Sequence, residues 1–258
     1  MAGEQEYKRV ASLKTVDAFR EYLGEIGVGI QVDDAILTAE QDSPLGKKLV
    51  VPFQGWDFEV GNCGVIHPME GWDGTEGGSP TEHVERRWER FGTSGAKIIW
   101  GGEAVAVSLE ARANPNQLSF NEDNLADFVK LRGKLVAAHE GRYGNSDDLL
   151  IGLQITHSGR FCKPFDKKKM EPKILQAHPT LNPKFHLPMD YPVLEDGEIR
   201  QIIEQYHKSA ELAYRAGFHF VDIKHCHGYL LHGFLSARNR GGDYGGEFNN
   251  RVRPLREI

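Results

Sequence analysis

Hydrophobic and polar positions recur along this chain with two periods, and their alternation predicts a succession of strands and helices. Helical spacing of apolar residues occurs around Val84, Trp88 and Phe91, over 121–140, and over 198–216. Short apolar runs typical of buried strands lie between these segments, at 65–66, 96–100, 149–156 and 218–224. Strands that alternate with helices at this spacing predict parallel βα units, in either a doubly wound or a barrel fold.

Local signals predict where the helices begin and end. Ser79, Pro80 and Glu82 form a helix start, with Ser79 as N-cap, Pro80 at the first helical position and Glu82 closing a capping box. Gly217 follows the third helix at a left-handed C-cap position. A fourth helix is expected to begin near Phe248 and still to be running at Ile258, where the sequence stops.

Two segments depart from this rhythm. Residues 1–60 carry a short helical pattern at 16–23, followed by acidic sequence interrupted by Gly and Pro, and we interpret them as an N-terminal extension or cap. The βα body is then 61–258. The connection 158–198 is unusually long and rich in proline. Loops of that size inside compact domains usually bind substrate or act as lids.

Composition and charge narrow the functional class. The 258 residues suffice for one large domain, and 37 Asp and Glu against 31 Lys and Arg argue against a dedicated binder of nucleic acid or anionic membranes. Apolar runs fall short of the ~20 residues that a membrane span needs. The three cysteines lie far apart without CxxC spacing, at Cys63, Cys162 and Cys226. This spacing argues against a disulfide framework or a cysteine-bound metal cluster, so we expect a cytoplasmic protein.

Polar residues at the ends of the predicted strands decide the chemistry, because function in parallel βα folds lies at the carboxyl ends of strands. Side chains alternate across a strand, so Gln154 is expected on the face opposite Leu153 and Ile155. By the same rule Asp222 and Lys224 share one face of the last strand. Buried charges need a partner or a use. Two interpretations are equally good: the two groups pair with each other or within a network, or they have a catalytic role.

Histidines and a tyrosine follow that strand, and two chemistries compete for them. A metal-dependent hydrolase could use His157, His225 and His227, although the chain lacks an HExxH pattern and supporting carboxylate spacing. Alternatively, His227 and Tyr229 could clamp a carbonyl group and donate a proton to the substrate. We favour this second interpretation.

Five segments of 61–258 carry a more specific signal, and they occur in this order: NCGVIHPMEG (62–71), EAVAV (103–107), GLQITHSGR (152–160), HGYLLHGFLS (227–236) and NRGGDYGGEFNNRVR (239–253). Together they resemble the Old Yellow Enzyme family of FMN-dependent oxidoreductases. The resemblance implies an α/β fold, a (β/α)8 TIM barrel with FMN at its C-terminal mouth. Because four βα units are recognisable, we expect the chain to hold the first half of that barrel and to be completed by a missing C-terminal half or by a homo-oligomer.

The resemblance also implies which residues meet the cofactor. Pro68, Met69 and Glu70 would lie along the flavin, Ala104 would contact its ring edge, and Gln154 would hydrogen-bond the pyrimidine carbonyl and N–H. Glu70 departs from the family pattern, in which Thr or Cys is more frequent. A carboxylate at that place would disfavour the anionic reduced flavin and lower its potential.

On the substrate side, the resemblance assigns His227 and Lys224 to a carbonyl clamp and Tyr229 to protonation of the α-carbon. Lys224 is the second departure, since the family usually has histidine there. The expected activity is hydride transfer from FMN, reduced by NADH or NADPH, to an α,β-unsaturated carbonyl compound or a related small molecule. The alternatives are the metal-dependent hydrolase and an inactive half-barrel that acts as an assembly partner.

Overall fold

The structure is a computed structural model that describes residues 7–35, 38, 43–53 and 55–258. The chain divides into two compact units, Met1–Lys47 and Lys48–Ile258. The first unit contains the 3-10 helices η1 (Val10–Ser12) and η3 (Pro44–Gly46) and the helix α1 (Val16–Glu25). The helix predicted at 16–23 is therefore confirmed. It begins where the Thr15 side chain accepts a hydrogen bond from the Ala18 N–H, a standard N-cap.

The second unit starts with an antiparallel hairpin that the sequence pattern did not predict. Its strands are β1 (Leu49–Phe53) and β2 (Trp56–Val60), within the segment that we had interpreted as an extension. Phe58 and Val60 of this hairpin pack against Ile98 and Leu150, the first residues of two strands of the parallel sheet. The hairpin therefore covers the amino ends of the sheet and leaves the carboxyl ends for the site.

The parallel sheet has five strands: β3 (Val65–Ile66), β4 (Ile98–Ile99), β5 (Ala104–Ala106), β6 (Leu150–Thr156) and β7 (Phe220–Ile223). β3 pairs with β4, β4 with the first part of β6, and β5 with the last part of β6. The strand predicted at 96–100 is therefore shorter in the structure, where it is β4, and β5 is a separate strand that the pattern did not predict. β7 lies on the other edge of β6. The Thr156 carbonyl accepts from the Val107 N–H, which follows β5, whereas the Ile155 carbonyl accepts from the Lys224 N–H, which follows β7.

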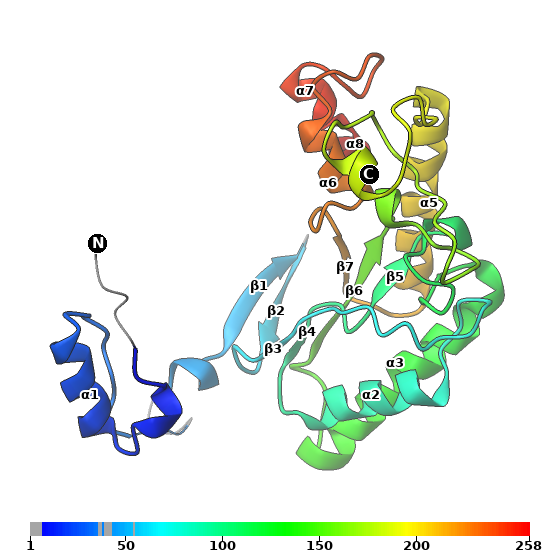
Figure 1. Cartoon of the computed structure of the whole chain (residues 1–258). Helices are drawn as coiled ribbons and strands as arrows, with labels where there is room; N and C mark the ends of the chain where they lie inside the picture. Colours follow the sequence, from blue (N-terminus) through cyan, green and yellow to red (C-terminus); the bar gives the residue numbers. More distant parts are fainter. Residues whose placement is uncertain (1–6, 36–37, 39–42, 54) are drawn as a thin grey trace, which may run out of the picture. The chain divides into compact units, whose positions relative to one another are not determined.

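Three long helices cover one face of this sheet: α2 (Glu82–Thr93), α3 (Leu125–Tyr143) and α5 (Asp196–Arg215) (Figure 1). Ile151, Leu153 and Ile155 of β6 belong to the hydrophobic core that these helices share with the sheet. The alternation predicted for this strand is therefore confirmed. The predicted capping box of α2 is wrong, because the helix begins at Glu82 with Thr81 as N-cap, and the Thr81 hydroxyl instead donates to the Asp73 carbonyl.

Short elements fill the connections. The long segment 158–198 contains η6 (Gly159–Phe161) and α4 (Leu181–Lys184), while η4 (Leu109–Ala111) and η5 (Glu122–Asn124) precede α3. α6 (Leu230–Ser236) was not predicted, and the helix expected from Phe248 onward consists of two pieces, α7 (Phe248–Arg251) and α8 (Arg253–Glu257). Among the described residues, no helix has the length and apolar character needed to cross a membrane. The fold is α/β with a curled parallel sheet.

Candidate active site

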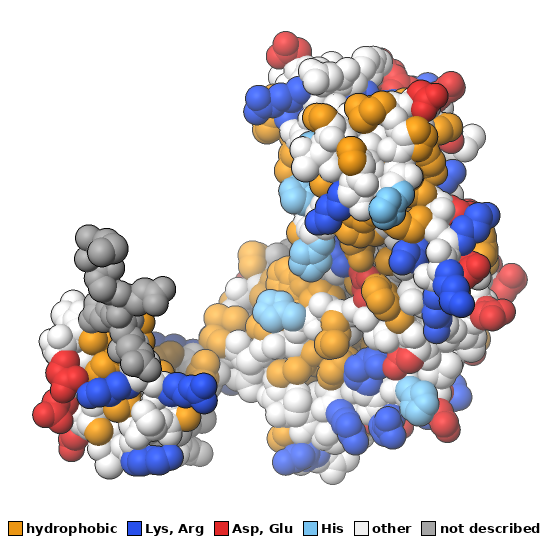
Figure 2. Space-filling model, viewed as in Figure 1, with side chains coloured by type: hydrophobic (Ala, Val, Ile, Leu, Met, Phe, Trp, Pro, Cys, Tyr) orange, Lys and Arg blue, Asp and Glu red, His pale blue; other side chains and the backbone are white. Residues whose placement is uncertain are grey.

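A cavity of about 560 Å³ lies at the carboxyl ends of the parallel strands. Seven of the eight predicted site residues line it, together with four residues that were not assigned to the site. The predicted ones are Pro68, Met69, Glu70, Gln154, Lys224, His227 and Tyr229, and the others are His67, Trp100, Asp222 and Cys226. On the face shown in Figure 2, hydrophobic side chains and histidines are exposed together over the sheet. Residues predicted from separate segments of the sequence therefore lie around one cavity in the structure.

Ala104 is the predicted residue that lies outside the cavity wall. It is fully buried in β5, where it pairs with Gln154 across the sheet. Its backbone N–H donates to the Met69 carbonyl at 3.0 Å. Ala104 therefore fixes the segment after β3 through its backbone.

Gln154 faces the cavity, as the alternation along β6 predicts. Its Nε2 donates to Asp222 Oδ2 at 2.5 Å, so the neighbouring strand orients the amide. Gly101 allows the backbone to approach closely here, because a Cβ at that position would lie 2.9 Å from the Cβ atoms of both Gln154 and Pro68. The amide is consequently held in one orientation at the base of the cavity.

Lys224 pairs with Glu70 across the cavity, with its Nζ 2.6 Å from Glu70 Oε1. Tyr229 donates its hydroxyl to the other carboxylate oxygen at 2.8 Å, and the Trp72 indole N–H donates to that same oxygen at 3.2 Å. The ammonium of Lys224 also lies 4.3 Å from the centre of the Tyr229 ring, in cation–π contact. Two interpretations were left open for Asp222 and Lys224. Pairing within a network is present for Lys224, and its partner is Glu70 rather than Asp222.

The pair is deeply buried, with side-chain exposures of 6% for Lys224 and 9% for Glu70. Burial raises the pKa of Tyr229 far above its ordinary value, and the neighbouring Glu70 carboxylate raises it further. The phenol therefore keeps its proton throughout the physiological pH range. The Glu70 charge is balanced by Lys224. The expected effect of Glu70 on the flavin potential therefore depends on both members of the pair.

A second charged group holds the segment that carries Glu70. The Gly71 N–H donates to Glu103 Oε1 at 2.6 Å, and Arg87 bonds both Glu103 Oε2 at 2.8 Å and the Asp73 carboxylate at 2.6 and 2.9 Å. Desolvation raises the pKa of the buried Glu103 carboxyl, and Arg87 opposes that shift. Sequence reasoning missed these residues. The available signal was Glu103 itself, the first residue of the EAVAV segment at 103–107.

The histidines do not converge on a metal. His157 is buried, which lowers its pKa to about 3, and its Nδ1 accepts the Gly159 N–H at 3.0 Å. His225 places its Nε2 2.5 Å from the Leu231 carbonyl oxygen. His227 lines the cavity from a left-handed backbone conformation with φ of 60°. Across the part of the chain that the structure describes, no three His, Cys, Asp or Glu side chains are grouped to bind a metal ion, so His157, His225 and His227 do not form the ligand set that the hydrolase alternative names.

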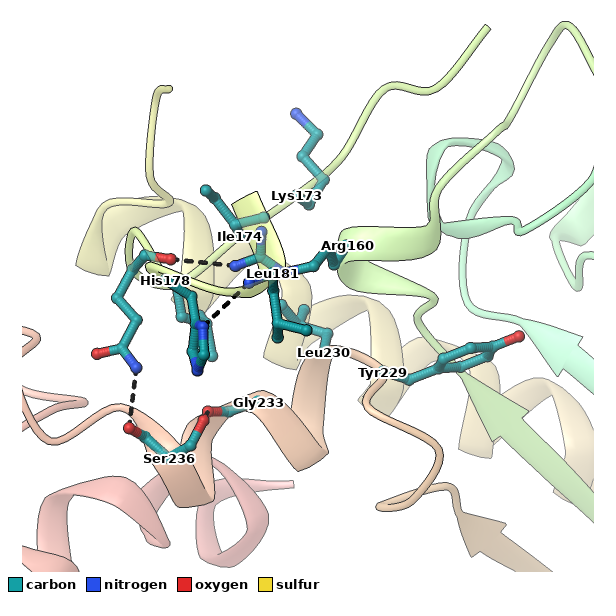
Figure 3. A pocket seen from close by; sticks show the side chains of 11 residues that line it. Arg160, Lys173, Ile174, His178, Leu181, Tyr229, Leu230, Gly233 and Ser236 are labelled. Carbon is teal, nitrogen blue, oxygen red and sulfur yellow. Dashed lines mark hydrogen bonds between the residues drawn. The ribbon is translucent and has the colours of Figure 1, made fainter. Parts of the chain in front are cut away.

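The long loop after β6 packs against Tyr229 on the side away from its hydroxyl group. A small cavity of about 50 Å³ is lined by this loop, by α6 and by Tyr229, whose hydroxyl points away from it (Figure 3). Arg160 braces the loop by donating to Asn182 Oδ1 at 2.8 Å and to the Gln176 carbonyl at 3.2 Å. Phe161 packs its ring 5.5 Å from that of Tyr229. The loop therefore positions a cavity residue.

Comparison with known proteins gives consistent matches. A family model described as "NADH:flavin oxidoreductase / NADH oxidase family" matches residues 49–258. An NADPH dehydrogenase of Bacillus velezensis is 28% identical over 230 residues, covering 83% of this chain and 59% of that protein. An NADPH dehydrogenase of Bacillus pumilus is 32% identical over 159 residues, covering 60% of this chain and 42% of that protein.

The structural comparison extends the likeness to the fold. The crystal structure of Old Yellow Enzyme from Pichia sp. AKU4542 matches with a TM-score of 0.64 and 21% identity, over 84% of this chain and 55% of that one. This likeness shows a shared TIM-barrel type of fold. The chain spans 42% to 59% of the length of these proteins.

Proposed function

Because this chain belongs to the NADH:flavin oxidoreductase / NADH oxidase family, we propose that its cavity is the flavin and substrate site of an FMN-dependent NAD(P)H oxidoreductase of the Old Yellow Enzyme type. The substrate is an α,β-unsaturated carbonyl compound or a related small molecule. The observation that carries this proposal is the gathering of seven residues, predicted from separate motifs, around one cavity.

The residues present fit a flavin ring. A volume of about 560 Å³ lies within the range of roughly 300–1,000 Å³ that small-molecule sites occupy. Met69 and Trp100, exposed by 57% and 41%, offer apolar surface for a planar ring. Gln154 gives one N–H to Asp222 and keeps its carbonyl oxygen and a second N–H, the pair of groups that a pyrimidine-dione edge requires.

Bound FMN would accept hydride from NADH or NADPH and pass it to the substrate. Around it, Pro68 and Met69 would lie along the ring and Gln154 would hydrogen-bond its pyrimidine edge. His227 would polarise the substrate carbonyl. Tyr229 would hold the proton destined for the substrate, and its raised pKa keeps that proton in place until a basic carbon is present.

We propose that further βα units complete the barrel. Within the described residues, β3 and β7 each pair with a single neighbour, so both outer edges of the parallel sheet have backbone groups available for pairing. A (β/α)8 barrel with this chain as its first four units satisfies both edges. The remaining units come from a longer chain or from a second copy.

FMN titration tests the proposal. The chain alone, and the chain co-expressed with the C-terminal half of a matching NADPH dehydrogenase, are titrated with FMN while flavin fluorescence and Tm are followed. We expect FMN to raise Tm in the completed barrel, and Gln154→Leu to weaken FMN binding by at least about tenfold, the loss of one or two hydrogen bonds.

The control is Gln201→Leu, which makes the same change on the exposed face of α5. Equal FMN affinity for the Gln154 and Gln201 variants would contradict the proposed site. A completed barrel that never binds FMN would favour the inactive half-barrel.

A further inference from the structure

Glu70 is held by three donors in the manner of a bound ligand. Lys224 takes one carboxylate oxygen at 2.6 Å, and Tyr229 takes the other at 2.8 Å, with the Trp72 indole N–H at 3.2 Å from that second oxygen. An ammonium and a phenol directed at the two oxygens of one carboxylate form a carboxylate-binding pair. The group that occupies this pair is a side chain of the same protein.

We propose that Lys224 and Tyr229 form a carboxylate subsite that Glu70 fills from within, and that Glu70 thereby restricts the pocket to uncharged substrates. This inference rests on the proposed function only in taking the cavity to be the substrate site. It concerns the substrate class, since a substrate with a carboxylate beside its reacting carbonyl would have to displace Glu70.

Two physical effects make Glu70 an effective competitor. It is tethered, so it acts at a high effective concentration without losing the entropy that a free ligand loses. Its negative charge also repels a second carboxylate within a few ångströms, and the burial of the pair weakens solvent screening of that repulsion. A free carboxylate must overcome both effects, whereas an uncharged carbonyl compound is not repelled by the Glu70 charge.

Removing Glu70 should therefore create an anion site. Benzoate serves as the probe, because its ring matches the apolar surface of Met69 and Trp100. In isothermal titration calorimetry of the full chain without flavin, we expect Glu70→Ala to bind benzoate at least about tenfold more tightly than the wild type. Benzamide, which is uncharged and similar in shape, should gain much less.

Two further variants separate this subsite from general electrostatics. Asp222→Asn removes one negative charge from the same cavity but leaves the Glu70–Lys224 pair intact. It should keep benzoate affinity within about twofold of the wild type. Glu70→Ala combined with Lys224→Met removes both partners and should lose the gain. The inference is overturned if Glu70→Ala gains nothing, if Asp222→Asn gains equally, or if the double variant keeps the gain.

A mirror experiment covers the case in which Glu70→Ala does not fold, as judged by circular dichroism. Lys224→Met leaves the Glu70 carboxylate without its cation and should bind benzylammonium at least about tenfold more tightly than the wild type. Equal affinity of the two proteins overturns the inference. Failure of the proposed function is distinguishable, since it shows as absent FMN binding in the completed barrel, whereas benzoate and benzylammonium are measured without flavin.

Discussion

Lys224→Met tests the structure of the site through its effect on folding. The substitution leaves the Glu70 carboxylate 9% exposed and without its cation. Removing one partner of a buried ion pair destabilises proteins by about 3–5 kcal/mol, because the remaining charge stays desolvated. The lost cation–π contact with Tyr229, at 4.3 Å, adds up to about 2 kcal/mol in a desolvated setting. We therefore expect the free energy of unfolding to fall by about 3–7 kcal/mol.

The companion variant replaces both partners, Glu70→Gln with Lys224→Met, and removes the uncompensated charge. Replacing a whole buried pair is often close to neutral, so we expect this double variant to recover most of the lost stability. Urea unfolding at pH 7 of the wild type, both single variants and the double variant gives the coupling energy. A coupling below about 0.5 kcal/mol would refute the pairing, since exposed ion pairs give values of that size.

Three further predictions concern catalysis, acid stability and redox potential. Tyr229→Phe should slow substrate reduction while leaving reduction of the flavin by nicotinamide largely intact in stopped-flow experiments, and equal loss of both half-reactions would contradict its proposed role as proton donor. Burial lowers the pKa of His157 from about 6.5 unfolded to about 3 folded, so the unfolded chain binds the extra proton and stability falls as pH drops below 6.5. Between pH 7 and 5 this amounts to about 2 kcal/mol, which His157→Asn should abolish in urea unfolding, and an equal pH dependence in both proteins would disprove it. Glu70→Thr should raise the potential of bound FMN, because it leaves the Lys224 cation uncompensated, and Glu70→Thr with Lys224→Met should return it toward the wild-type value in a redox titration; a lower potential in the single variant would be inconsistent with this pairing.

Much of the fold follows from local pattern, and the reasons are visible in β6. Alternation of side chains along a strand is a strictly local property, so it correctly placed Gln154 on the cavity side and Ile155 in the helix-covered core. The helix start near Ser79 was misjudged because the signals for N-cap and first turn recur at Thr81, three residues before the first buried residue, Val84. Local sequence does not distinguish two such adjacent starts.

The ion pair of the site lies beyond such reasoning. Lys224 has Asp222 two residues away on the same face of its strand, and that carboxylate was the nearest candidate in sequence. The actual partner, Glu70, is 154 residues away in the sequence. It reaches Lys224 because the segments that follow β3 and β7 both line the cavity at the carboxyl ends of the parallel strands. Arg87 and Glu103, which hold the segment after Glu70, were missed for the same reason, since long-range pairing depends on tertiary geometry.

We propose that the amide of Gln154 and the side chains of His227 and Tyr229 surround one flavin ring. The most direct test of this proposal is a crystal structure of the completed barrel with FMN bound. We expect the isoalloxazine in the cavity of about 560 Å³, with its pyrimidine edge on Gln154 and the other two side chains across the ring. A flavin bound elsewhere, or a cavity filled by packed side chains in the holoprotein, would contradict it.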